Sequence, residues 1–198
     1  MEAALYDSES MRRFAGIDLA TDLVPDETSI LRFRHLLEKY QLTEKLFAEV
    51  RQLLEEKKLL LKSGTIVDAT IIAAPPSTKN AAQQRDPEMK QTRKGKQWHF
   101  GMKVHVGTDR RGLVHSVVTG PASEGDITRL DDLLHGQERE LFGDQAYWSE
   151  DHRRHCREAG IAYRVNRRAK PGRVLTAQEK KINRSRSRHR ARGEHAFH

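Results

Sequence analysis

The sequence has a single cysteine, Cys156, and it has no long apolar run. One cysteine cannot form a disulfide within the chain, and it fits a reducing cytoplasm. No stretch approaches the roughly 20 apolar residues that a helix needs to cross a bilayer, and the amino-terminal residues lack a secretory signal pattern. There is also no internal repeat. These absences argue against a disulfide-rich secreted protein and a membrane protein, and they favour a cytoplasmic one.

Positive charge is unevenly distributed along the chain. The net charge is +8, and the composition of 36% hydrophobic and 32% charged residues indicates a water-soluble domain with a thin core. Residues 164–198 contain 12 Lys and Arg against two acids, so the remaining residues carry a net charge of −2. A second basic patch spans residues 90–96. This pattern predicts a polyanionic partner, and nucleic acid is the leading candidate. The alternative is a solvated basic helix without a partner, which would have the same composition.

The stretch Gly64–Ile72, GTIVDATII, predicts a buried strand. Its β-branched residues fit a pleated sheet, and apolar side chains fall on both faces. Asp68 is its only charged residue, and a buried carboxylate is costly unless it meets a cation or a hydrogen-bond donor. Two interpretations stay open at this point. The carboxylate is satisfied by backbone N–H groups or an arginine, or it belongs to a functional acidic site.

Periodicity and turn residues predict the other elements. Helices over residues 26–40 and from an N-cap at Thr43 to the EEKK segment form an αα-hairpin, a motif that more often packs than binds DNA. Residues 73–96 are polar and without periodicity, which predicts a long mobile loop. We further expect strands at 100–106, 113–118, 140–142 and 161–165, and helices at 127–134 (capped by Asp126), 149–159 and 176–198, the last with a Thr176–Glu179 capping box.

This order of elements predicts a mixed α/β fold. A sheet that begins as a hairpin and continues with strands alternating with helices is mixed in direction and carries helices on its faces. We expect two parts, an amino-terminal helical region over residues 1–62 and a sheet domain over residues 63–198.

Three acidic residues that lie far apart in the sequence are candidates for one site. Asp68 lies on the central strand, Asp144 directly follows the strand 140–142 at the carboxyl end of the sheet, and Glu194 lies within the last predicted helix. Converging carboxylates repel one another without a cation. Mg²⁺ (or Mn²⁺) suits oxygen ligands, and two such ions can stabilise the attacking and leaving oxygens of a phosphoryl displacement.

Five blocks in the same order resemble bacterial insertion-sequence transposases of the DDE type, and more narrowly the insertion-sequence-five branch of the insertion-sequence-four group. The blocks are IVDATII, GKQWHFGMKVHVGTD, GLVHSVVTGPASEGD, LFGDQAYWS and RSRHRARGEHAFH. The resemblance implies a ribonuclease-H-like catalytic domain over residues 63–198, with Asp68, Asp144 and Glu194 as the metal-binding catalytic triad. It also implies DNA cleavage at transposon ends, followed by attack of a 3′-hydroxyl on target DNA.

The same resemblance implies residues that would bind double-stranded DNA. The group's signature has an Arg four residues before the Glu, a place that Arg190 holds, whereas Ser187 stands where a Tyr is usual. Trp148 is interpreted either as an aromatic that stacks on a base or as a core or rim aromatic. A homodimer is left open, and the expected location is the cytoplasm, at the nucleoid. The DNA-binding residues expected from the basic segments and these positions are Arg190, Trp148, Lys94, Lys96, Lys103, Arg186 and Arg188.

The resemblance further predicts a chain that is shortened at both ends. The Lys of the group's signature would fall seven residues after Glu194, beyond the last residue of the sequence. Because helix ends fray, we expect Glu194 to be weakly fixed and the activity to be weak or absent.

Three other functions fit parts of the pattern. One is a catalytically inactive DNA-binding transposase remnant, the second is a ribonuclease-H-class nuclease that cuts without joining, and the third is a basic RNA-binding protein suggested by SRSRHRAR alone. Zinc is not predicted, because His152, His155 and Cys156 have no second ligand pair at zinc-finger spacing.

Overall fold

A computed structural model describes residues 2–75, 84–169 and 172–197. The chain divides into two compact units, Met1–Glu56 and Lys57–His198. No helix in the described ranges is both long enough and apolar enough to cross a membrane.

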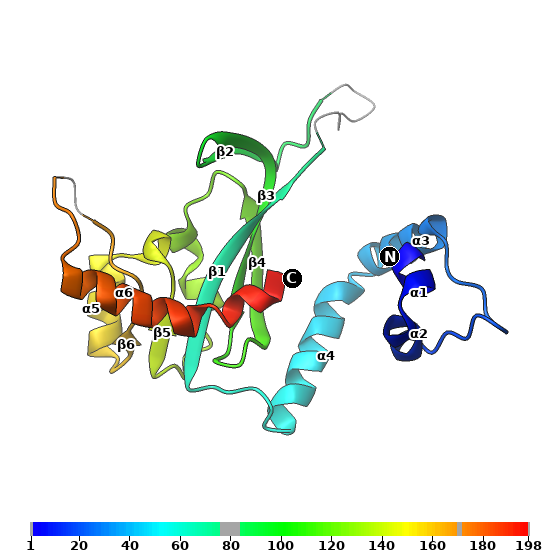
Figure 1. Ribbon diagram of the computed structural model, residues 1–198, viewed down its shortest axis with the longest axis horizontal. Coiled ribbons are helices and arrows are strands. Elements are labelled where there is room, and N and C mark those ends of the chain that lie inside the picture. Colours follow the sequence, from blue (N-terminus) through cyan, green and yellow to red (C-terminus); the bar gives the residue numbers. More distant parts are fainter. Residues whose placement is uncertain (1, 76–83, 170–171, 198) are drawn as a thin grey trace. The chain divides into compact units, whose positions relative to one another are not determined.

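The first unit is helical (Figure 1). Its elements are α1 (Glu2–Asp7), α2 (Glu9–Ala15), α3 (Glu27–Lys39) and α4 (Leu42–Glu56). Asp26 caps α3 by accepting a hydrogen bond from Ser29 N at 2.7 Å, because a side-chain acceptor satisfies an N–H that has no partner within the helix. The predicted αα-hairpin of α3 and α4 is confirmed. Its break lies two residues earlier than the expected N-cap, at Gln41 with φ +50°, so Thr43 lies inside α4 and is not its N-cap.

The second unit is built on one mixed sheet, which confirms the predicted fold class (Figure 1). The strand order is β2-β3-β1-β5-β6, and β4 also pairs with β3. The pairs of β3 with β1, β2 and β4 are antiparallel, whereas β1 with β5 and β5 with β6 are parallel. The strands are β1 (Gly64–Ala73), β2 (Lys90–Lys94), β3 (Gln97–Thr108), β4 (Val114–Pro121), β5 (Glu140–Phe142) and β6 (Ala162–Tyr163).

The two faces of the sheet are covered by different elements, because side chains alternate along a strand. Val67 and Leu141 point into the main core with Leu130, Tyr147 and Cys156. That face is therefore covered by the short 3₁₀ helices η1 (Asp126–Arg129), η2 (Asp131–Leu133) and η3 (Gln145–Tyr147) and by α5 (Glu150–Glu158).

The opposite face receives the basic carboxyl-terminal segment. Phe142 packs on His189 of α6 (Ala177–Arg190) with 5.3 Å between ring centroids, and Gly193 of η4 (Gly193–Phe197) lies against Ile66. Asp68 shares this face with Ile66, two residues away. The alternation of β1 therefore turns Asp68 toward α6 and η4.

Three expected elements differ from those observed. The loop predicted for residues 73–96 contains β2, a polar strand that pairs with β3, while residues 76–83 of that loop lie outside the described residues. The helix predicted at 127–134 is the pair η1–η2, with Gly125 and not Asp126 at its N-cap position. The strand predicted at 161–165 is shorter, Ala162–Tyr163.

The last predicted helix is divided into two. Its capping box is confirmed, with Thr176 and Glu179 exchanging hydrogen bonds, but α6 ends at Arg190 and Glu194 lies in η4. The chain turns because Gly193 approaches the sheet closely. A Cβ atom at Gly193 would lie 2.8 Å from Ile66 Cγ2 and 3.2 Å from Thr108 Oγ1.

Gly193→Ala is expected to lower the free energy of unfolding by about 1–3 kcal/mol, because the added methyl overpacks the contact with the buried Ile66. Urea unfolding followed by circular dichroism measures the change. Gly125→Ala is the matched control, since its Cβ would have no neighbour within 4 Å and its φ of −72° suits any residue. Equal losses in both variants would contradict the proposed close approach.

A polar cluster is buried near β4. His115 Nε2 lies 3.3 Å from Thr65 Oγ1, which donates to Glu138 Oε1 at 3.0 Å. Burial, followed by the neighbouring His135, lowers the pKa of His115 from 6.5 to about 4. The unfolded chain therefore binds more protons than the folded chain between these two values, so stability falls as the pH falls through this window.

His115→Gln is expected to reduce this acid destabilisation by about 2–3 kcal/mol, the scale set by a pKa that falls from 6.5 to about 4. The measurement is the urea midpoint at pH 6.5 and near pH 4. The exposed residue His155 supplies the control His155→Gln, which should keep the wild-type pH dependence. The explanation fails if the two variants respond to acid alike.

Candidate active site

Asp68 is the partly buried centre of an acidic cluster at the sheet. Its side chain is 16% exposed, and it accepts hydrogen bonds from Ala69 N at 3.0 Å and from Arg190 Nη1 at 2.7 Å. Burial raises the pKa of Asp68, Arg190 lowers it, and the negative charges of Asp144 and Glu194 raise it again. The structure thus places all three predicted acids within electrostatic reach of one another.

Strand register brings Asp144 beside Asp68. Ile66 of β1 pairs in parallel with Phe142 of β5, and the same offset of 76 residues (142 − 66 and 144 − 68) separates the two acids. Neighbouring strands run about 4.8 Å apart, so Asp144, two residues after β5 ends, lies at the level of Asp68 in β1. Asp144 Oδ1 accepts from Ala146 N at 2.8 Å and so caps η3.

Glu194 reaches the cluster from η4 and not from the long helix. Its carboxylate accepts from Arg190 Nη2 at 2.8 Å, and its side chain is 47% exposed. η4 contacts β1 and β3, and Gly193 beside it is buried. Arg190 and the packing of Gly193 position Glu194 here, and the expectation that Glu194 is weakly fixed stays a prediction.

One cleft of about 600 Å³ contains these groups. Asp68, Asp144, Glu194 and Arg190 line it, and so does Asp126, which the sequence suggested only as a helix cap. Asp126 accepts from Lys103 Nζ at 2.8 Å, an ion pair that joins η1 to β3. No local pattern marks Asp126 as part of the site, because its partner lies 23 positions away in the sequence.

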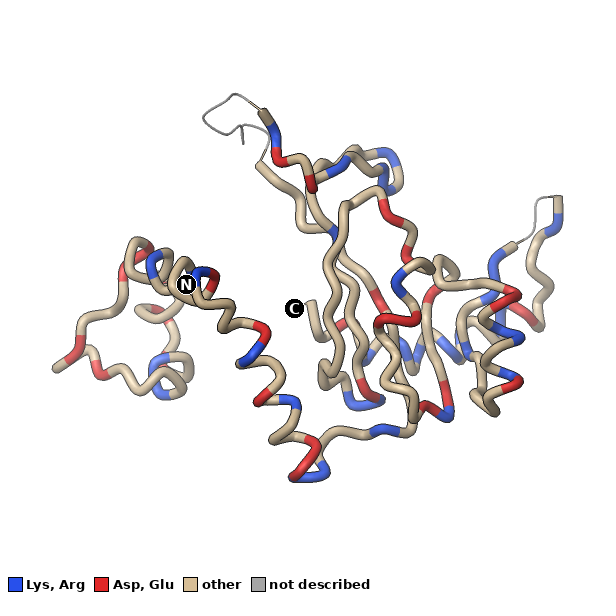
Figure 2. The backbone as a smooth tube through the Cα atoms, turned by 180° about the vertical axis from the view of Figure 1, so that it is seen from behind, with Lys and Arg blue, Asp and Glu red and all other residues tan. Residues whose placement is uncertain are grey.

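The predicted DNA-binding residues fall into two groups. Arg190, Lys94 and Lys103 line the cleft, although the Lys103 ammonium is engaged by Asp126 and by Glu124 O at 2.6 Å. Figure 2 shows that Lys and Arg recur along α6 and in the hairpin of β2 and β3. The remaining four are not among the residues that line this cleft: Lys96, Arg186, Arg188 and Trp148.

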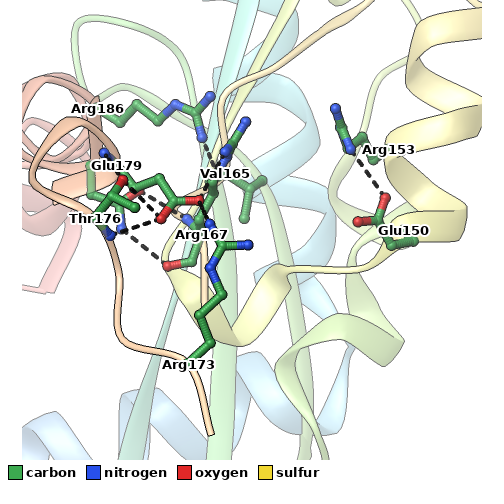
Figure 3. A network of polar contacts seen from close by, with 9 residues as sticks. Glu150, Arg153, Val165, Arg167, Arg173, Thr176, Glu179 and Arg186 are labelled. Carbon is green, nitrogen blue, oxygen red and sulfur yellow. Dashed lines mark hydrogen bonds and ion pairs between the residues drawn. The ribbon is translucent and has the colours of Figure 1, made fainter. Parts of the chain in front are cut away.

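These four residues have different surroundings. Lys96 is exposed in the turn between β2 and β3, and Arg188 is exposed on α6. Arg186 donates to Val165 O at 2.6 Å (Figure 3), and burial lowers the pKa of its guanidinium. Trp148 lines a separate pocket. Arg186 is thus engaged inside the protein, whereas Lys96 and Arg188 face the solvent.

The acidic cluster suits a divalent cation by the chemistry of its donors. Carboxylate oxygens are the ligands that such hard cations prefer. Among residues 2–75, 84–169 and 172–197, however, no three His, Cys, Asp or Glu side chains are grouped closely enough to hold a metal ion. The Arg190 guanidinium bridges Asp68 and Glu194, so it supplies the positive charge where a cation would bind.

A mixed sheet with one acid in its central strand β1, a second just after the neighbouring strand β5, and a basic helix against the same face is consistent with the class of proteins that have a ribonuclease-H-like fold. Comparison with known families specifies the class. Residues 60–198 match the family described as Transposase DDE domain, and residues 1–36 match the one described as Transposase domain (DUF772). The chain belongs to the DDE transposase family, which implies a DNA phosphoryl transferase. No solved structure matches the chain.

Arg190→Gln is expected to lower the free energy of unfolding by about 1–3 kcal/mol at neutral pH, because Asp68 then stays buried without its cation. Thermal unfolding in EDTA and in Mn²⁺ measures this, and Mn²⁺ should stabilise the variant more than the wild type. Arg188→Gln, which removes an exposed arginine of the same helix, is the control and should behave like the wild type. An Arg190→Gln protein as stable as the wild type in EDTA would refute the importance of this ion pair.

Proposed function

We propose that the protein is a DNA transposase of the insertion-sequence-five branch, which cleaves phosphodiester bonds at transposon ends and joins them to target DNA. The main support is the convergence of Asp68 from β1, Asp144 from the N-cap of η3 after β5, and Glu194 from η4 in one cleft. The parallel register of β1 and β5 sets two of these positions. An arrangement fixed by the sheet is a rigid platform for chemistry that depends on positioning.

In this proposal Asp68, Asp144 and Glu194 would hold Mg²⁺ or Mn²⁺, which requires their carboxylates to draw closer together than they lie in the described residues. The metal, when bound, would supply positive charge to the phosphate and to the attacking and leaving oxygens. Asp68 is the deepest of the three donors, with 16% of its side chain exposed against 47% for Glu194. Arg190 keeps the two carboxylates neutralised in the absence of the metal, and Lys103 orients Asp126 at the border of the same cleft.

The substrate is double-stranded DNA, both as transposon end and as target. Lys94, Lys96 and Arg188 present exposed cations for its phosphates. We assign residues 63–198 to the catalytic domain and residues 1–62 to an amino-terminal helical domain. Action on chromosomal DNA places the protein at the nucleoid, and a homodimer would allow two transposon ends to be held together.

A second candidate is a DNA-binding transposase remnant without turnover. The bridge from Arg190 to Asp68 and Glu194 favours it, because a permanent guanidinium there would exclude a metal ion. The two candidates differ in metal dependence, since a remnant would bind DNA equally well in EDTA and would cleave none.

The test is nicking of a supercoiled plasmid by the purified chain in Mn²⁺. Asp68→Asn and Asp144→Asn should each reduce the rate at least 100-fold, about 2.7 kcal/mol of transition-state stabilisation. Asp151→Asn is the control, because Asp151 is an exposed acid of α5 that pairs with Arg154 and lies outside the cleft. Nicking that survives in both cleft variants would contradict the proposal, and nicking without strand transfer would identify a nuclease.

A further inference from the structure

A second pocket in the same unit gathers arginines around an aromatic side chain. It has a volume of about 710 Å³, and the side chains at its wall come from η3–α5 and from the segment that leads into α6. Arg153, Arg167, Arg168 and Arg173 line it together with Trp148. Figure 3 shows Arg167 and Arg173 converging on Glu179, with Arg153 and Glu150 on the other side. None of these residues belongs to the acidic cleft.

Glu179 holds two of these arginines in place. Its Oε1 accepts from Arg167 Nη1 at 3.3 Å and from Arg173 Nη2 at 3.2 Å, while its Oε2 accepts from Thr176 N at 2.9 Å as part of the α6 cap. The carboxylate is 14% exposed, whereas the Arg167 and Arg173 side chains are 38% and 60% exposed. The Glu179 carboxylate therefore orients both guanidiniums, and both arginine side chains remain accessible to solvent.

The strand-like segment below the pocket is also fixed. Asn183 of α6 accepts from Arg167 N at 2.9 Å and donates to Arg167 O at 3.0 Å, and Arg186 donates to Val165 O. The base of the Arg167 side chain is thus clamped to α6. A clamped arginine loses less conformational freedom when it binds an anion.

The pocket carries more positive than negative charge. Four arginines face only Glu150 and Glu179, and Arg168 has no ion-pair partner within the described parts of the chain. Trp148 adds a rigid wall, packed on Tyr163 with 5.6 Å between ring centroids and 5.9 Å from the Arg153 guanidinium. A planar guanidinium donates in pairs, which suits the oxygens of a phosphate.

We propose that this arginine pocket binds the phosphate backbone of duplex DNA at a point separate from the acidic cleft. The proposal rests on the proposed function and extends it. Helix α6 joins the two places, because Glu179 lies at its start and Arg190 at its end. Eleven residues of helix measure about 17 Å, which corresponds to about five base pairs along B-DNA. The pocket would hold the DNA about half a helical turn from the bond that is cut.

The test measures affinity of the full chain for a fluorescein-labelled duplex by anisotropy in EDTA, over about 50 to 200 mM salt. Arg167→Gln/Arg173→Gln should weaken binding at least tenfold and reduce the slope of log K against log salt by about 2. Arg168→Gln removes an exposed arginine that has no ion pair among the described residues, so it should reduce the slope by about 1, and it covers the case in which the double variant does not fold.

The matched control is Arg111→Gln/Arg139→Gln. It removes the same charge from two exposed side chains near the amino-terminal end of β1, where Arg139 N donates to Ser63 O. An equal loss of slope in the two double variants would overturn the proposal, because it would indicate diffuse charge and no site. An unchanged slope in Arg168→Gln and in Arg167→Gln/Arg173→Gln would overturn it as well.

The fluorescence of Trp148, which lines the arginine pocket, reports on binding at that pocket. In a Trp98→Phe background Trp148 is the only tryptophan, and its emission should change on addition of the duplex. Unchanged emission at saturating duplex would contradict the proposal. Because these measurements need no cleavage, loss of the pocket and loss of the active site are distinguishable: the arginine variants change binding in EDTA, whereas Asp68→Asn changes nicking.

Discussion

The ion pair between Asp68 and Arg190 is the interaction on which the site depends. A carboxylate in the middle of a sheet is costly to ionise, and its neighbours Asp144 and Glu194 increase that cost. Arg190 at 2.7 Å is the cation that offsets it. Because Arg190 is the last residue of α6, this contact fixes the end of the helix against the sheet and leaves η4, with Glu194, beside β1. Neutralising one acid and placing another are consequences of the same arginine.

Burial alone does not mark an acid as functional, as Asp109 demonstrates. Asp109 is fully buried, yet its carboxylate accepts from the N–H groups of Leu61, Arg111 and Leu113 at 2.8–2.9 Å. It is satisfied by backbone and organises a turn. Asp68 instead meets one backbone N–H, one arginine and two further acids. Asp109 is thus satisfied by backbone donors, whereas Asp68 and Glu194 share a single arginine.

Sequence patterns were reliable where structure depends on neighbours along the chain. Strand β1, helix α5 and the Thr176–Glu179 capping box follow from local propensity and hydrogen bonding. They failed for β2, whose residues are polar because this edge strand is mostly exposed and needs no apolar alternation. They also failed for the end of α6, since the close approach of Gly193 to Ile66 joins residues far apart in sequence.

The sequence by itself determined the class of fold, the three candidate acids and the concentration of positive charge after residue 164, because β-branched runs, turn residues and charge are properties of the chain. The tertiary structure alone decided which side chains meet. The parallel register of β1 and β5 aligned Asp68 with Asp144. The packing of α6 on the sheet placed Arg190 against Asp68, and the turn after α6 placed Glu194 beside Arg190. The ion pair with Lys103 fixed Asp126 at the same cleft. Register and packing arise from contacts between distant segments, so no window of the sequence contains them.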